Sequence, residues 1–173
     1  MRDGKIVAAV TGMDHGHING MTEGIGEAGA VIKWAYDPDT EKTKTFLDHF
    51  QKFQVKEAKN LEQILEDPEV DLVLSACIPS QRADLGIRVM EAGKDYFVDK
   101  APFTTLEQLE RIRKAIDKTR RKYMVYYSER LHSEAGVYAG KLVKDGVIGD
   151  VVQVMGMAVS YTHLRAHETD QYL

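Results

Sequence analysis

The chain has 173 residues, of which 29% are charged and 43% hydrophobic, and its net charge at pH 7 is −4. This length suits one domain with a buried core. We expect no nucleic-acid partner, because no basic stripe is present, and no membrane partner, because no apolar run approaches the ~18 residues of a spanning helix. The single cysteine, Cys77, excludes an internal disulfide and favours a reducing, cytoplasmic location.

The first part of the chain predicts a βαβ unit. An apolar run at 5–11 reads as a strand, a Gly-punctuated turn follows at 12–16, and a helix leads to a second apolar run that ends at Asp37. Asp37 comes about 25 residues after Gly12, roughly the separation expected of a dinucleotide-binding fold. The helix N-terminus would offer N–H groups to a pyrophosphate, and Asp37 would bind the adenosine ribose. An acid there favours NAD over NADP, because it would repel a 2′-phosphate.

The glycine pattern of this turn is incomplete. The full G-x-G-x-x-G motif would need glycine at 14 and 17, where the chain has Asp14 and His17. Asp14 adds bulk and a charge of the wrong sign for a phosphate, so a turn that binds no nucleotide is the alternative. A metal site on His15 and His17 would need a third ligand, and we favour capping or phosphate-contacting roles and expect no metal.

Strands and helices alternate through the rest of the chain. We expect further strands at 54–56, 71–77, 95–98, 123–127 and 151–155, and helices at 38–50, 60–66, 80–92, 104–116 and 133–144. Side-chain caps are expected at Asp39, Asn60, Ser80 and Thr104. The alternation predicts an α/β fold with a doubly wound, Rossmann-like parallel sheet, in which the apolar run at 71–77 is a central strand.

The last fifteen residues, 159–173, lose this alternation. Their sequence VSYTHLRAHETDQYL resembles one reading frame of a sequencing-library adapter, so we interpret it as a translated scar without functional meaning. His163 and His167 have a spacing that could chelate a metal on a helix, but they fall in this segment. We therefore expect the chain to be an N-terminal fragment of a longer protein.

Five motifs together resemble the Gfo/Idh/MocA family (glucose–fructose oxidoreductase, inositol dehydrogenase and MocA). They are GMDHGH at 12–17, WAYDPDTEK at 34–42, EDPEVDLVLSACIPS at 66–80, EAGKDYFVDKAP at 91–102 and KLVKDGVIGDVVQVMG at 141–156. The most specific is VDKAP, which matches the Glu-Lys-Pro signature of the family with Asp99 for Glu and an inserted Ala101. The resemblance implies a dinucleotide-binding domain at 1–127, and a connecting helix with the first strand of a truncated α+β substrate domain at 128–158.

The resemblance also implies roles for individual residues. Gly12, Asp14, His15 and His17 would line the pyrophosphate turn, Asp37 would bind the adenosine ribose, Cys77, Ile78 and Pro79 would lie against the cofactor, and Asp99 would lie near the nicotinamide ribose. Lys100 would be the catalytic residue at the reaction centre, where its ammonium can polarise or orient a substrate hydroxyl. Family members often carry His at the position of Arg82, and Arg130 matches a frequent family arginine.

The activity that the resemblance implies is NAD-dependent hydride transfer between nicotinamide and a hydroxyl-bearing carbon of a sugar, cyclitol or similar polyol. In the family the general acid/base lies in the second domain, so we expect the fragment itself to be inactive and any homo-oligomer to form through that domain. Two alternatives stay open: a non-catalytic nucleotide-binding regulatory or scaffold protein, and an NAD-dependent glycosidase of the same family.

Overall fold

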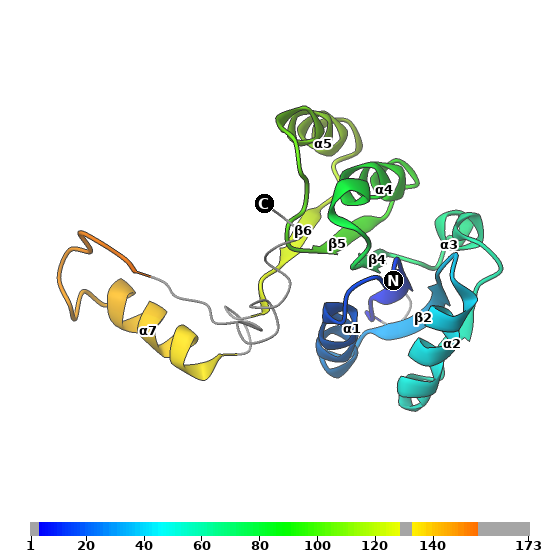
Figure 1. The fold of residues 1–173 in the computed structure, drawn as a ribbon, viewed down its shortest axis with the longest axis horizontal. Helices are drawn as coiled ribbons and strands as arrows, with labels where there is room; N and C mark the ends of the chain where they lie inside the picture. The colour runs from blue at the N-terminus through cyan, green and yellow to red at the C-terminus, as the bar shows by residue number, and fades with distance from the viewer. Residues whose placement is uncertain (1–3, 129–132, 156–173) are drawn as a thin grey trace, which may run out of the picture. The chain divides into compact units, whose positions relative to one another are not determined.

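A computed structural model describes residues 4–128 and 133–155, and Figure 1 shows their fold. The chain divides into two compact units, Met1–His132 and Ser133–Leu173, which are considered separately. Within the described residues, no helix combines the length and apolar character needed to span a membrane.

The first unit is built on a parallel sheet flanked by helices. Its strands are β1 (Val7–Thr11), β2 (Val31–Tyr36), β3 (Lys56–Glu57), β4 (Leu72–Ser75), β5 (Asp95–Asp99) and β6 (Tyr123–Tyr126). Its helices are α1 (His17–Glu27), α2 (Thr40–His49), the short 3-10 helix η1 (Gln51–Phe53), α3 (Leu61–Glu66), α4 (Pro79–Glu91) and α5 (Leu106–Thr119). The strand order is β3-β2-β1-β4-β5-β6, with every pairing parallel, which confirms the predicted doubly wound sheet.

The sheet is covered on both faces (Figure 1). Ala8 and Val10 of β1 pack in one apolar cluster with buried side chains of α1 and α2. Ala9 points the other way and packs in a second cluster with buried side chains of α3 and α4. This double covering explains why β1 and β4 are nearly continuous apolar runs rather than alternating ones.

The order in which the chain adds strands to the sheet reverses between β1 and β4, although the two strands are parallel. From β1 the chain builds outward through β2 and β3, then returns to add β4 on the other side of β1. The chain segments that follow β1 and β4 therefore lead to helices on opposite faces of the sheet, α1 and α4. In open α/β sheets, ligands bind in the crevice at such a switch point.

Two of the expected helix caps are confirmed. Asp39 Oδ1 accepts a hydrogen bond from the backbone N–H of Glu41 at 3.0 Å, and Asn60 Oδ1 accepts one from Gln63 at 2.9 Å. Each satisfies an N–H group that has no partner within the helix.

The other two caps of the first unit are corrected. The expected cap at Thr104 is displaced by one residue: Thr105 Oγ1 accepts from the Gln108 N–H, and Gln108 Oε1 accepts from the Thr104 N–H. The expected cap at Ser80 is wrong, because α4 already begins at Pro79. Proline suits the first position of a helix, since its φ angle is fixed near the helical value and it lacks the N–H that would stay unpaired.

The second unit contains α7 (Glu134–Lys144), where Ser133 Oγ accepts a hydrogen bond from the Gly136 N–H. The helix expected at 133–144 is thus confirmed. The strand expected at 151–155 is wrong: these residues are exposed and adopt no regular structure. A strand is stabilised by hydrogen bonds to a neighbouring strand, and no described residue pairs with this segment.

A polar network ties the C-terminal end of α3 to β2. Asp67 Oδ2 accepts hydrogen bonds from Lys33 Nζ at 2.5 Å and from Trp34 Nε1 at 2.6 Å, and Asp67 Oδ1 accepts one from the Glu69 N–H. Burial by itself would raise the pKa of Asp67, but these donors lower it from 3.8 to about 2. The charged carboxylate is therefore the form that stabilises this part of the fold.

The network predicts acid sensitivity that depends on Asp67. Because the pKa is lower in the folded chain than in the unfolded chain, the stabilisation is fully present above about pH 4 and is lost as the pH falls towards about 2. We expect Asp67→Asn to reduce this decline in the free energy of unfolding. Urea unfolding followed by the fluorescence of Trp34, the sole tryptophan, measures it. Asp48→Asn, at an exposed acid of α2, is the control, and an Asp67→Asn variant with the wild-type pH profile would contradict the prediction.

Candidate functional site

The turn after β1 is held against the loop after β4. Gly12 has φ +67°, a left-handed conformation that favours glycine, and its carbonyl accepts a hydrogen bond from the Ala76 N–H at 2.9 Å. A Cβ on Gly12 would lie 2.6 Å from Cys77 Cβ and 2.7 Å from Ser75 Oγ. Only glycine therefore lets the two loops approach so closely.

Asp14, which stands where the nucleotide-binding pattern has glycine, joins three parts of the edge. Its Oδ2 accepts a hydrogen bond from the Ile78 N–H at 3.2 Å, and its Oδ1 accepts one from Lys42 Nζ of α2 at 2.5 Å. That bond to Asp14 is the main reason why the pKa of Lys42 is raised. Lys42 thus balances the negative charge that the sequence placed on the turn.

Asp37 follows β2 and is almost fully buried, with 5% of its surface exposed. Its Oδ2 accepts from the Met13 N–H at 2.7 Å and its Oδ1 accepts from the Asp39 N–H at 3.0 Å. Each carboxylate oxygen keeps a further lone pair. Asp37 therefore fixes the β1 turn in place and retains acceptor capacity.

A groove of about 470 Å³ runs along this side of the edge. Its lining includes the predicted site residues Gly12, Asp14, Asp37, Cys77 and Ile78, and the charged side chains Asp39, Lys42, Asp84 and Arg88. The groove lies at the β1–β4 switch point, where a dinucleotide fold holds the adenosine part of its cofactor. The residues present fit an adenosine, because apolar surface for the base adjoins carboxylates for ribose hydroxyls.

The loop after β4 presents its backbone and apolar side chains to the groove. Ile78 is 49% exposed, whereas Cys77 is buried, and burial raises the pKa of its thiol. A buried thiol kept protonated is a poor nucleophile, so Cys77 serves here as a small apolar residue. Pro79 then opens α4.

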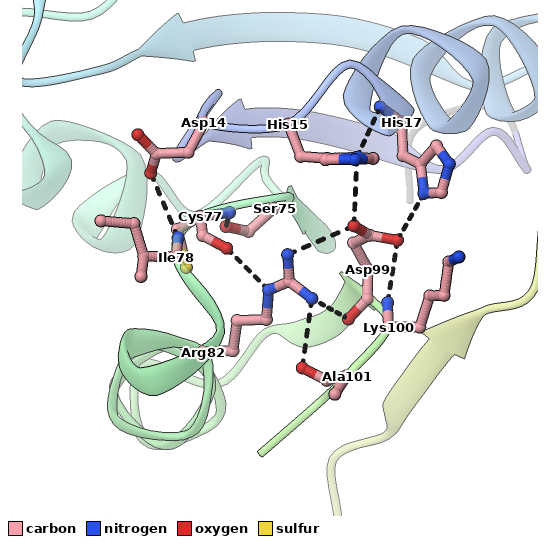
Figure 2. Close-up of polar contacts among 10 residues, drawn as sticks. All are labelled: Asp14, His15, His17, Ser75, Cys77, Ile78, Arg82, Asp99, Lys100 and Ala101. Carbon is pink, nitrogen blue, oxygen red and sulfur yellow. Dashed lines mark hydrogen bonds and ion pairs between the residues drawn. The ribbon is translucent and has the colours of Figure 1, made fainter. Parts of the chain in front are cut away.

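The remaining predicted residues meet at Asp99, as Figure 2 shows. Asp99 ends β5 and is 1% exposed; its Oδ1 lies 2.8 Å from His17 Nδ1 and accepts from the Lys100 N–H at 2.8 Å. Its Oδ2 lies 3.5 Å from His15 Nδ1. Burial and the neighbouring His17 lower the pKa of His15, although Asp99 acts in the opposite direction. Within the described residues, His15, His17 and Asp99 form the one cluster whose ligand atoms could hold a metal ion.

Arg82 is the residue whose role the sequence analysis missed. It is 2% exposed, and its Nη2 donates to Asp99 Oδ2 at 3.2 Å. The same guanidinium donates to three backbone carbonyls, those of Cys77 at 2.7 Å, Asp99 at 3.0 Å and Ala101 at 3.1 Å. Arg82 thus holds the loop after β4 and the Asp99–Ala101 turn together. Its position on the inward stripe of α4, with Gly86 and Val89, is the signal that could have revealed its burial.

The structure therefore brings the predicted site residues to one edge in two groups. Gly12, Asp14 and Asp37 lie at the groove with Cys77 and Ile78, and Pro79 begins α4 directly after them. His15, His17 and Lys100 gather around Asp99. Arg130 lies outside the described residues.

The Arg82 contacts predict a large loss of stability in Arg82→Met. The variant leaves the buried Asp99 without its guanidinium partner, and breaking a buried ion pair costs about 3–5 kcal/mol. Arg82→Lys should recover little, because an ammonium cannot reproduce the planar donor geometry. Arg113→Met, at a pair that is more than half exposed, should change the unfolding free energy by about 1 kcal/mol or less. Urea unfolding gives all three values, and an Arg82→Met variant as stable as the wild type would refute this role.

Comparison with known proteins agrees with this geometry. The chain is 38% identical to a crystal structure described as that of an oxidoreductase from Erwinia carotovora atroseptica, with a TM-score of 0.82 over 86% of this chain and 44% of that one. The structure of myo-inositol 2-dehydrogenase from Lactobacillus plantarum has a TM-score of 0.71 at 16% identity, over 86% of this chain and 43% of that one, and shares the fold. The uncharacterized oxidoreductase YhhX of Escherichia coli K12 is 31% identical over 96 residues, which are 55% of this chain and 27% of YhhX.

The chain thus spans less than half the length of these relatives. A family profile described as an oxidoreductase family with an NAD-binding Rossmann fold matches residues 11–127, which include the last residue of β1, Thr11, and all of β2 to β6. On this match, and on the carboxyl-edge site that the same residues build, the chain belongs to the Gfo/Idh/MocA oxidoreductase family and carries its NAD-binding Rossmann domain.

Proposed function

We propose that this domain binds NAD rather than NADP across the carboxyl edge of its sheet, with the adenosine in the groove beside Asp37. The observation that carries the proposal is the charge of that groove. Its acids are Asp14, Asp37, Asp39 and Asp84, and its cations are Lys42 and Arg88. Lys42 is already paired with Asp14, Arg88 with Glu62, and Asp84 with Arg111. A 2′-phosphate would meet an excess of carboxylates, whereas ribose hydroxyls can donate to them.

Other residues of the edge would hold the rest of the cofactor. Gly12 and His15 would face the pyrophosphate, and the Cys77–Pro79 loop would pack against the dinucleotide. Asp99 lies one strand further along the edge, where the nicotinamide ribose would come within its reach. The single cysteine is a free, buried thiol, and this supports the proposal that the protein functions in the reducing cytoplasm.

For the whole protein, we infer hydride transfer with a sugar, cyclitol or similar polyol. Bound nicotinamide would supply the hydride chemistry, and this chain would orient it. Lys100 is exposed beside the buried Asp99, and its ammonium can bind or polarise a substrate hydroxyl there. The myo-inositol 2-dehydrogenase among the structures of the same fold makes polyols the first substrates to test.

The groove predicts a measurable preference between the two cofactors. We expect the chain to bind NADH at least about tenfold more tightly than NADPH, a difference of about 1.4 kcal/mol. Titrations followed by nucleotide and Trp34 fluorescence measure both dissociation constants. Asp37→Asn should narrow the preference by removing the charge while keeping an acceptor for the Met13 N–H.

Asp48→Asn is the matched control, because it removes an exposed acid of α2 that does not line the groove. It should leave the ratio of the two dissociation constants unchanged. Equal affinity of the wild type for NADH and NADPH, or a ratio that Asp37→Asn does not alter, would overturn the proposed preference.

A further inference from the structure

Two imidazoles and a carboxylate converge beside the β1 turn. The candidate ligand atoms of His15, His17 and Asp99 all lie within 4.8 Å of one another. His17 Nδ1 is 2.8 Å from Asp99 Oδ1, and His15 Nδ1 is 3.5 Å from Asp99 Oδ2. The histidines come from the start of α1 and the aspartate from the end of β5, so the fold assembles the cluster from distant parts of the chain.

These separations are close to those of a metal site. Zinc binds imidazole nitrogen and carboxylate oxygen at about 2.1 Å, which places the ligand atoms of a tetrahedral site ~3.4 Å apart. The two measured distances lie on either side of that value. The two imidazole nitrogens lie within 4.8 Å of each other, and His15 Nδ1 also accepts a hydrogen bond from the His17 N–H at 3.2 Å. A rotation of the His15 side chain that releases this bond and brings the imidazoles closer together would place the three atoms around one ion.

The carboxylate of this cluster is also held as metal ligands usually are. Ligating carboxylates commonly accept further hydrogen bonds that fix their orientation. Here Arg82 Nη2 and the Lys100 N–H donate to Asp99 at 3.2 and 2.8 Å, and Figure 2 shows the two imidazoles on the side of the carboxylate away from Arg82. The Tyr126 ring packs edge-on against the His17 ring, with centroids 5.9 Å apart, and limits its rotation.

We propose that His15, His17 and Asp99 form a binding site for a divalent first-row transition metal ion such as Zn²⁺. Two imidazole nitrogens and one carboxylate suit zinc and its neighbours better than Mg²⁺ or Ca²⁺, which prefer oxygen ligands. Three protein ligands leave a coordination position for water or a ligand. The His15 side chain is 54% exposed, so an ion can reach the site from solvent.

The charge balance sets how tightly the ion is held. Arg82 already neutralises Asp99, and its guanidinium repels a dication that shares the same carboxylate. We therefore expect weaker binding than at a closed four-ligand structural zinc site. The site does not depend on nucleotide binding, since it needs only side chains that the fold has already assembled.

Zinc titration by calorimetry, without nucleotide and on the untagged full chain, tests the proposal. The reference protein carries His163→Ala and His167→Ala, because that pair also has a metal-chelating spacing in the sequence. We expect one Zn²⁺ per chain. His15→Ala and His17→Ala in this background should each weaken binding by more than the roughly 10–100-fold typical of losing an outer-shell partner. His49→Ala, at an exposed histidine of α2, is the matched control and should bind Zn²⁺ like the reference.

A second measurement tests the carboxylate. Asp99→Asn removes a ligand but also the buried partner of Arg82, so circular dichroism must first establish that it folds. The amide NMR resonance of Lys100 in the reference protein provides the same information without this variant, because its N–H donates to Asp99. Zinc should shift that resonance in the reference protein and not in His17→Ala.

Three outcomes would each overturn the site. Zinc binding could be lost when only His163 and His167 are removed, or neither His15→Ala nor His17→Ala could weaken it. The third outcome is a Lys100 amide resonance that zinc does not shift. NADH titration in the presence of a chelator tests the proposed cofactor separately. Either proposal can therefore fail while the other stands.

Discussion

The buried carboxylate of Asp99 is the interaction on which the carboxyl edge depends. A charge removed from water is costly unless it is paired and hydrogen bonded, and Asp99 is almost completely enclosed. Arg82 of α4 supplies the opposite charge at Oδ2, while His17 Nδ1 of α1 lies 2.8 Å from Oδ1, which also accepts from the Lys100 N–H. One carboxylate thus connects β5 to helices on both faces of the sheet. The loops that would meet a cofactor are positioned relative to each other through it.

Asp14 shows how a departure from the glycine pattern is accommodated. An aspartate on a phosphate-binding turn would repel an anion if its charge were unbalanced. Lys42 lies against one of its oxygens, and the Ile78 N–H donates to the other. The aspartate therefore links the turn to α2 and to the loop after β4. The charge of Asp14 is therefore no longer an argument for the alternative of a turn that binds no nucleotide.

The proposed metal site and the proposed cofactor site share His15, His17 and Asp99. A ligand that binds the folded chain through shared residues changes the affinity for the other by the same factor in both directions. Zinc could lower dinucleotide affinity by occupying these side chains, or raise it by attracting phosphate oxygens. The two titrations, each made without the other ligand, supply the reference values from which that coupling would be measured.

The sequence by itself determined the order and type of the elements of the first unit. Apolar runs separated by helical segments predict a parallel sheet, because strands covered on both faces are apolar along their whole length. The turn at Gly12, with Asp37 after the next strand, predicts where a nucleotide would bind, because this pattern is local in the sequence. The exact ends of the elements are harder to predict: the N-cap of α5 is Thr105 rather than Thr104. Residues 151–155 have a strand-like composition and form no strand, since a strand also requires a neighbour.

Only the tertiary structure decided what surrounds Asp99. His17 lies 82 positions away in the sequence and Arg82 lies 17 away, and no periodic pattern links them to it. They meet because the strand order places β4 between β1 and β5, so the helices that follow β1 and β4, α1 and α4, begin at the same edge of the sheet as the end of β5. The third ligand that the two histidines lacked in the sequence is therefore supplied by the sheet. Contacts of this kind depend on the packing of the whole domain, which local sequence does not specify.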